Sequence, residues 1–216
     1  MVVGNNTNLY AYYYITDVTI DVSNRTRLDY FFYHFETLVN LTLLNVNSNV
    51  SQVDSMFQEC RNIVSPPLFS TSNCTGFAQM FQACVKLENV PLYDVHNGLS
   101  FLSMFYNCSK IETIPAFVTT SATNFNTMFR GCTELKNVPV FDATNVTTMS
   151  NMFQNCRQLT GTSLNNIMAM CISTTSAYTG AKTLQALGLG SSYYGSMVPL
   201  LPNYSAFLNA GWTTGW

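Results

Sequence analysis

Two glutamates lie at one position of neighbouring sequence repeats, and of all residues they come closest to a catalytic pair. Glu88 and Glu112 are separated by one repeat length. Stacked repeats would bring their carboxylates about 5 Å apart, the separation found in retaining glycosidases. The same face also carries Lys86, Lys110, Glu134 and Lys136. Lys110 would neighbour Glu134 and Lys136 would neighbour Glu112, so a solvated ladder of opposite charges explains all of these residues. A catalytic dyad explains only the two glutamates, and we predict that the chain is not an enzyme.

The histidines give no sign of a metal centre. His34 and His96 are the two in the chain, and neither has cysteine or aspartate around it at metal-ligand spacing. The sequence also lacks a glycine-rich phosphate loop, a nucleophile elbow and a zincin motif. We therefore predict no catalytic residue, no metal site and no cofactor.

Five of the seven cysteines recur at one fixed interval. They are Cys60, Cys84, Cys108, Cys132 and Cys156. Stacked repeats would place them about 5 Å apart, which is within disulfide reach. An odd-numbered column cannot pair completely, however, and small buried thiols are common core residues. We predict a reduced, buried cysteine column, with Cys74 and Cys171 as further free thiols. Apolar surroundings argue against a reactive thiolate.

The element that positions all these residues is a repeat of 24 residues within residues 50–160. A Met-Phe-x-x-Cys motif begins at Met56, Met80, Met104, Met128 and Met152, without one insertion or deletion. A fixed period of this length is the signature of a solenoid, in which each unit buries its apolar face against its neighbours. The sequence therefore predicts one elongated domain whose function resides on its surface.

Within one repeat, two kinds of short element are expected. Phe77, Met80, Phe81 and Cys84 follow the i, i+3, i+4, i+7 pattern of one helical face. Residues 87–90 read as a very short strand that ends at Pro91, because proline cannot donate to a sheet ladder. Tyr93 then closes the bottom of the core, and an Asn/Ser-rich turn leads to the next unit.

The string Met/Ala-Phe-x-x-Cys-x-x-Leu-x-x-Ile/Val resembles the BspA-type leucine-rich repeat, in a variant with Met-Phe for Ala-Phe. The resemblance covers residues 50–160. It implies an α/β repeat solenoid that is leucine-rich-repeat-like and right-handed, with a short parallel sheet on one face and short helical turns on the other. The early proline after each expected strand departs from the pattern of this family, and it leaves the curvature of the solenoid undetermined. Proteins of this family are bacterial cell-surface adhesins, protist surface proteins and phage structural or tail proteins.

The two ends are expected to be irregular, because terminal units must cover exposed core. Residues 1–49 are predicted to be an aromatic-rich cap with a degenerate first repeat over residues 29–49. Residues 9–22 are β-branched and aromatic, which predicts a strand. The cap holds more aromatic side chains than one short element readily buries, so a protein contact is a second explanation beside capping. The candidate contact residues are Tyr10, Tyr12, Tyr13 and Tyr14, and the aromatic cluster continues with Tyr30, Phe31 and Tyr33.

Residues 161–216 are predicted to be a helical cap with a Gly-Trp tail. Short helices are expected over residues 163–171 and 181–187, and a last helix from Tyr204. Trp212 and Trp216 in the tail are candidate contacts for a partner. Similar Gly-Trp ends occur in phage-encoded versions of this repeat, which favours a virion protein.

Composition limits the partners. Charged residues form 9% of the chain, against about 25% in ordinary soluble domains, and the net charge is −2. These values exclude the electrostatic signature of nucleic-acid binding. No apolar run reaches the roughly 18 residues that span a bilayer, and no secretory signal is visible after Met1.

We therefore expect a non-catalytic bacteriophage virion protein. It would be tail- or fibre-associated or a capsid decoration, assembled in the host cytoplasm and released by lysis. Its partners would be other virion proteins or a host surface receptor, and a homo-oligomer remains open. The aromatic cap, the charged face and the Gly-Trp tail are its candidate interaction surface. The alternative is a bacterial or protist cell-surface adhesin.

Overall fold

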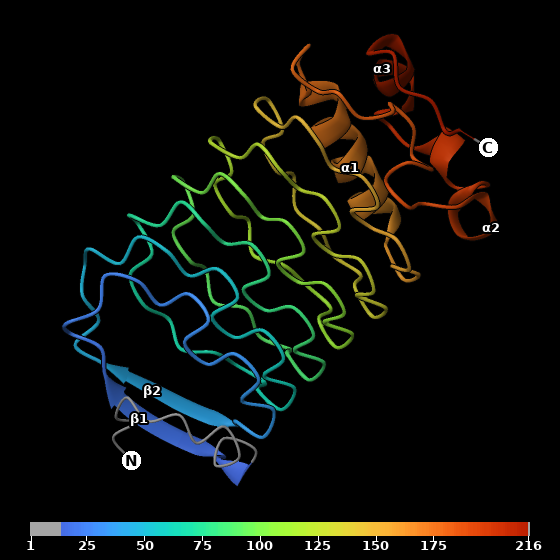
Figure 1. Cartoon of the computed structure of the whole chain (residues 1–216). Coiled ribbons are helices and arrows are strands. Elements are labelled where there is room, and N and C mark those ends of the chain that lie inside the picture. The colour runs from blue at the N-terminus through green and yellow to red at the C-terminus, as the bar shows by residue number, and fades with distance from the viewer. Residues whose placement is uncertain (1–13, 216) are drawn as a thin grey trace.

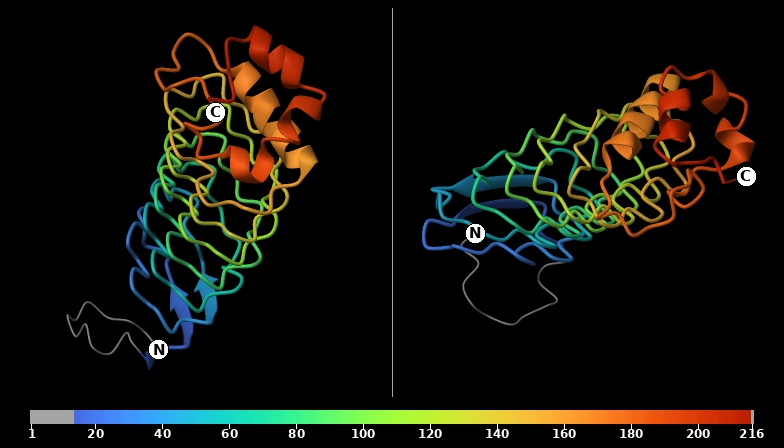
Figure 2. Two further views of the ribbon diagram at one scale, coloured as in Figure 1. Left: turned by 90° about the vertical axis from the view of Figure 1, so that its right-hand side faces the viewer. Right: turned by 90° about the horizontal axis from the view of Figure 1, so that it is seen from above.

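In the computed structural model, which describes residues 14–215, the chain winds through stacked coils along one axis (Figure 1). The N-terminal part and the C-terminal helices lie at opposite ends of the stack (Figure 2). The elements are the strands β1 (Asp17–Asp21) and β2 (Asn40–Leu44), the helices α1 (Gly161–Ser173), α2 (Ser191–Tyr194) and α3 (Tyr204–Asn209), and the 3-10 turn η2 (Val198–Leu200). None of these helices is long and apolar enough to cross a membrane.

Equivalent residues of successive coils are joined by parallel bridges. These bridges link Arg27 to Gln52, Gln52 to Gly76, Gly76 to Ser100, Ser100 to Asn124 and Asn124 to Thr148. The spacing between partners is the repeat length from Gln52 onward, so the sequence period is the length of one coil. Each coil therefore presents the same repeat positions on the same side of the stack.

The segments predicted as short helices are successions of tight turns, so that prediction is wrong. Phe57 N donates to Met80 O of the next coil at 2.9 Å, whereas Cys60 N donates to Phe57 O within its own coil at 3.0 Å. Ser55 and Glu59 have left-handed φ values of 54° and 64°. Alternate amides thus point to the next coil, which is incompatible with the i to i−4 bonding of an α-helix.

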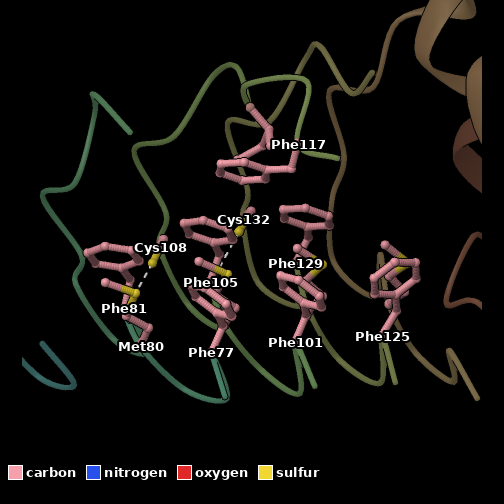
Figure 3. Close-up of a cluster of buried hydrophobic side chains, with 14 of the residues drawn as sticks. Phe77, Met80, Phe81, Phe101, Phe105, Cys108, Phe117, Phe125, Phe129 and Cys132 are labelled. Carbon is pink, nitrogen blue, oxygen red and sulfur yellow. Dashed lines mark hydrogen bonds between the residues drawn. The ribbon is translucent and has the colours of Figure 1, made fainter. Parts of the chain in front are cut away.

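The core is a set of columns that run along the stack. The phenylalanines of the repeated motif are stacked, as in Phe81–Phe105 with a centroid distance of 5.6 Å and an interplanar angle of 8° (Figure 3). Cys108 Sγ donates to the carbonyl of Phe81 in the preceding coil at 2.9 Å. All seven cysteines are buried and free, which confirms the predicted burial of the column. Burial raises the thiol pKa, to about 12 for Cys156.

The residues predicted as short strands are extended, but they form little sheet. Among residues 61–145, all of which the structure describes, one isolated bridge lies on this side, between Thr113 and Asn137. Glu88 N and Asn89 N both donate to the same carbonyl, Val64 O, at 3.0 and 3.1 Å. A regular parallel ladder uses one carbonyl per donor, so this sharing interrupts the sheet before the proline ends it.

The only two strands in residues 14–215 belong to neighbouring coils at the N-terminal end. β1 pairs with β2 in parallel, with Asp17 opposite Asn40 and Asp21 opposite Leu44. The predicted strand over residues 9–22 is therefore confirmed for Asp17–Asp21. Residues 9–13 lie outside the described part of the chain.

At the other end α1 covers the last coil with its buried residues Leu164, Ile167, Met168, Met170 and Cys171. The predicted helix over 163–171 is confirmed, and so is the last helix, α3, which begins at Tyr204. Residues 181–187 form turns, so a helix there was wrongly predicted. The reason is that the backbone hydrogen bonds between coils continue through these residues, since Phe153 N donates to Leu187 O at 2.8 Å.

Candidate interaction surface

The predicted charge ladder of Lys86, Glu88, Lys110, Glu112, Glu134 and Lys136 lies on the surface. Lys110 Nζ pairs with Glu134 Oε1 at 2.5 Å, and Lys136 Nζ pairs with Glu112 Oε1 at 2.6 Å. Both predicted cross-coil pairs are confirmed. The hydrogen bond to Glu134, followed by its charge, raises the pKa of Lys110. Because these side chains are exposed, water and salt screen their interaction.

The ladder arrangement also accounts for the two glutamates of the catalytic hypothesis. Lys136 binds the carboxylate of Glu112, and Lys110 is attracted by both Glu88 and Glu112. Glu88 and Lys86 are exposed at the first step of the ladder. The surroundings of the two glutamates are therefore alternating charges in solvent, the environment of an ordinary protein surface.

The aromatic candidates at the two ends have different outcomes. Tyr14 is 87% exposed, so its ring is available to a partner. Tyr10, Tyr12, Tyr13 and Trp216 lie outside the described residues. Trp212 is fully buried, and its assignment to an interaction surface is wrong. It lies 5.2 Å from Tyr178 and 5.9 Å from Phe207 between ring centroids, inside the C-terminal cap.

The glycine before Trp212 explains that burial. Gly211 has a φ of +81°, Trp212 N donates to Phe207 O at 3.2 Å, and Gly211 N donates to Leu208 O at 2.9 Å. These two bonds form a Schellman motif, which ends α3 and turns the chain back over it. Trp212 is thereby carried into the cap, where Nε1 donates to Thr174 Oγ1 at 3.4 Å.

A column of exposed aliphatic side chains, not predicted from the sequence, also lies on the surface. Leu44, Leu68, Leu92 and Val140 are 43%, 66%, 63% and 52% exposed, and Ala116, also exposed, completes the series at the repeat interval. We call these five residues the aliphatic column. Four intervals at the usual strand spacing give it a length of about 19 Å. Single exposed leucines are ordinary, but an aligned series forms a continuous apolar strip.

Leu44 lies in β2, where exposed and partly buried side chains alternate, and the proline segment explains why the other four side chains point outward. Tyr93 follows Leu92 and is buried, and Tyr93 N donates back to Pro91 O at 2.9 Å. This tight turn puts neighbouring side chains on opposite sides, so an inward aromatic forces an outward aliphatic. Within the described coils, no backbone hydrogen bond joins the proline and the two residues after it to their equivalents in the next coil. The signal available in the sequence was an aliphatic residue after each repeat proline.

Comparison with known proteins gives one family. The model of DUF285, described as a Mycoplasma protein of unknown function, matches residues 14–115, 52–166 and 88–186. These three overlapping matches together span residues 14–186. DUF285 is related to BspA-like repeat proteins. No curated protein and no solved structure matches the chain.

Proposed function

The chain belongs to the DUF285 family, and we propose that it is a non-catalytic interaction protein, a right-handed solenoid of the leucine-rich-repeat kind whose outer face binds another protein. The observation that carries the proposal is the aliphatic column. Its residues are exposed on every coil from Leu44 to Val140, although a repeat fold needs no apolar residue at an outward position. Contact with a partner supplies the reason for placing them there.

The chemistry of the column defines the partner. The strip is apolar and uncharged, and the chain has few charged residues overall. It therefore fits a protein surface that presents a narrow aliphatic ridge rather than a nucleic acid or an acidic peptide. Covering the exposed two thirds of Leu68 or Leu92 would contribute about 1–2 kcal/mol each. The paired charges of the ladder would lie at the rim, where they add specificity more than affinity.

We propose a virion as the setting, with the protein associated with a tail or fibre or decorating a capsid, and with virion proteins or a host surface receptor as partners. Support comes from the resemblance to phage structural and tail proteins and from the elongated body with few charges (Figure 2). The second candidate is a cell-surface adhesin. The description of the matched family favours it, because Mycoplasma is a cellular organism.

The test measures binding of the labelled full chain to purified virions and to intact cells of the source organism. The variant carries Leu68→Asn and Leu92→Asn together, and we expect it to bind at least about 30-fold more weakly than the wild type. Leu200→Asn is the matched control, because Leu200 is 82% exposed in η2 and lies off the column. It should bind within about twofold of the wild type.

Equal binding by the double variant and the wild type, with the same melting temperature, would refute the aliphatic column as the binding face. The place of binding decides the setting. Immunogold labelling of purified virions supports the virion, whereas labelling confined to the surface of intact cells supports the adhesin and rejects the virion.

A further inference from the structure

A cluster of potential metal ligands lies between the first two repeat coils. One atom each from His34, Glu36 and Glu59 lies within 4.8 Å of the others. Their side chains are 38%, 34% and 21% exposed, so the cluster is open to ions from solvent without being fully solvated. The sequence hid this group because Glu59 comes from the following coil.

Each separation between His34 and a glutamate, taken by itself, fits two ligands of one cation. His34 Nδ1 is 3.6 Å from Glu36 Oε1, and His34 Nε2 is 3.6 Å from Glu59 Oε1. Both distances exceed the roughly 3.2 Å limit of a good N–H to O hydrogen bond. Two ligands at zinc bonding distance in a tetrahedral arrangement are about 3.4 Å apart. The two contacts use different ring nitrogens, and only one nitrogen can bind a given ion. Either pair of His34 and a glutamate is thus spaced for two ligands of one ion, and a ligand atom of the third residue lies within 4.8 Å.

Arg61 holds the two carboxylates from their other side. Its Nη2 lies 2.5 Å from Glu59 Oε2, and its Nε lies 3.5 Å from Glu36 Oε2. The guanidinium therefore contacts the Oε2 atoms, while the Oε1 atoms of both glutamates face His34. Hydrogen-bonded partners of this kind orient carboxylate ligands around a metal.

The repeat backbone explains why two members of the cluster lie side by side. His34 and Glu59 occupy the same repeat position with left-handed φ values of 62° and 64°. The later coils use Ala83, Asn107, Gly131 and Asn155 there. The repeat imposes this conformation on residues of many types, so it holds His34 and Glu59 at equivalent places on adjacent coils.

We propose that His34, Glu36 and Glu59 form a site for a divalent transition-metal ion, with Zn²⁺ as the fitting ion. A set of one imidazole and two carboxylates is a mixed nitrogen and oxygen set, which zinc accepts and which calcium and magnesium do not prefer. Three protein ligands leave the fourth tetrahedral position open to water or to a ligand group from a partner protein.

The test is calorimetric titration of the full chain with ZnCl₂ at neutral pH under reducing conditions. We expect one ion per chain, and binding at least 10-fold weaker for His34→Ala and for Glu59→Gln. His34→Ala suits the backbone, because Ala83 adopts a φ of 61° at the equivalent position. Glu36→Gln provides the same test should His34→Ala fail to fold. Calcium chloride in place of zinc should give no binding.

His96→Ala is the matched control. His96 Nδ1 lies 2.7 Å from Asp94 Oδ1, and among residues 14–215 this pair belongs to no group of three potential ligands, so its loss should leave zinc binding unchanged. Titration at 25 °C avoids a complication of melting experiments, since unfolding exposes seven thiols that bind zinc in the unfolded state. Absence of zinc binding to the wild type would overturn the site. Full binding by a folded His34→Ala or Glu59→Gln variant would overturn it equally.

Discussion

We predict that the buried cysteine column makes the stability of this protein sensitive to alkaline pH. Burial raises the pKa of Cys60, Cys84, Cys108, Cys132 and Cys156 above that of an ordinary thiol. Each Sγ donates to a phenylalanine carbonyl of the preceding coil at 2.9–3.1 Å. A thiolate has no proton to donate and would leave that carbonyl unpaired, so the native state holds these thiols protonated.

The direction and size of the effect follow from linkage. A thiol whose pKa is higher in the folded state contributes stability below its unfolded pKa and loses that contribution as pH rises toward the folded pKa. With an unfolded pKa of about 8.5–9, each such thiol lowers the free energy of unfolding by about 1.4–2 kcal/mol at pH 10. The five together remove about 7–10 kcal/mol, which is comparable with the whole stability of a typical domain. Unfolding is therefore expected near pH 10.

The assay is urea unfolding under reducing conditions at pH 7, 8, 9 and 10. The matched variant is Cys108→Ala, which removes one thiol from the column. Its loss of stability between pH 7 and pH 10 should be smaller than that of the wild type by about 1.4–2 kcal/mol, whatever the variant costs at pH 7. A wild type whose free energy of unfolding stays constant up to pH 10 would show that the thiols ionise in the native state, and the reasoning would be refuted.

Three further predictions concern packing and charge. Phe105→Ala should lower the free energy of unfolding by about 3–5 kcal/mol and the melting temperature by about 10 °C. The reason is that Phe105 is fully buried and stacks on both Phe81 and Phe129. A loss under about 1 kcal/mol, measured by urea unfolding, would contradict the stacked core. Trp212→Ala should lower the free energy of unfolding by about 3–5 kcal/mol in the same assay, because Trp212 is fully buried. Replacing an exposed tail residue would leave the free energy of unfolding almost unchanged. Lys110→Ala should lower the free energy of unfolding by less than about 1 kcal/mol. A double-mutant cycle with Glu134→Ala should give a coupling energy that vanishes in 1 M salt. A coupling energy that persists in salt would indicate a desolvated ion pair.

Sequence analysis predicted the features that depend on period alone. The buried Met, Phe and Cys columns and the charge ladder follow from residue type and spacing, because stacked equivalent positions must be neighbours. It mistook the turns over residues 53–60 for helix, since an i, i+3, i+4, i+7 pattern also arises from consecutive turns. The difference is set by left-handed φ values at Ser55 and Glu59, which neither residue type signals.

The end of the chain was harder to predict for another reason. Trp212 is large and lies close to the C-terminus, where exposure is common, but the conformation of Gly211 directs it inward. The contact between His34 and Glu59 was equally invisible, because the first coil step is 25 residues rather than 24, as the bridge from Arg27 to Gln52 shows. A search at the strict repeat interval does not align these two residues.

The hydrogen bonding of the coils also explains why binding residues would lie on the proline side. On the turn side, alternate amides donate to the next coil, as from Ser55 N to Ala78 O at 2.9 Å, so a substitution there that disturbs the backbone disturbs two coils. On the proline side, the two residues after Pro67 and after Pro91 make no backbone hydrogen bond to another of the described coils. Leu68 and Leu92 can therefore change without breaking the hydrogen bonds that join the coils. Leu68→Asn should accordingly leave the free energy of unfolding within about 0.5 kcal/mol of the wild type. Selection on binding can then act on the aliphatic column independently of selection on folding, which is the separation that an interaction protein built from repeats requires.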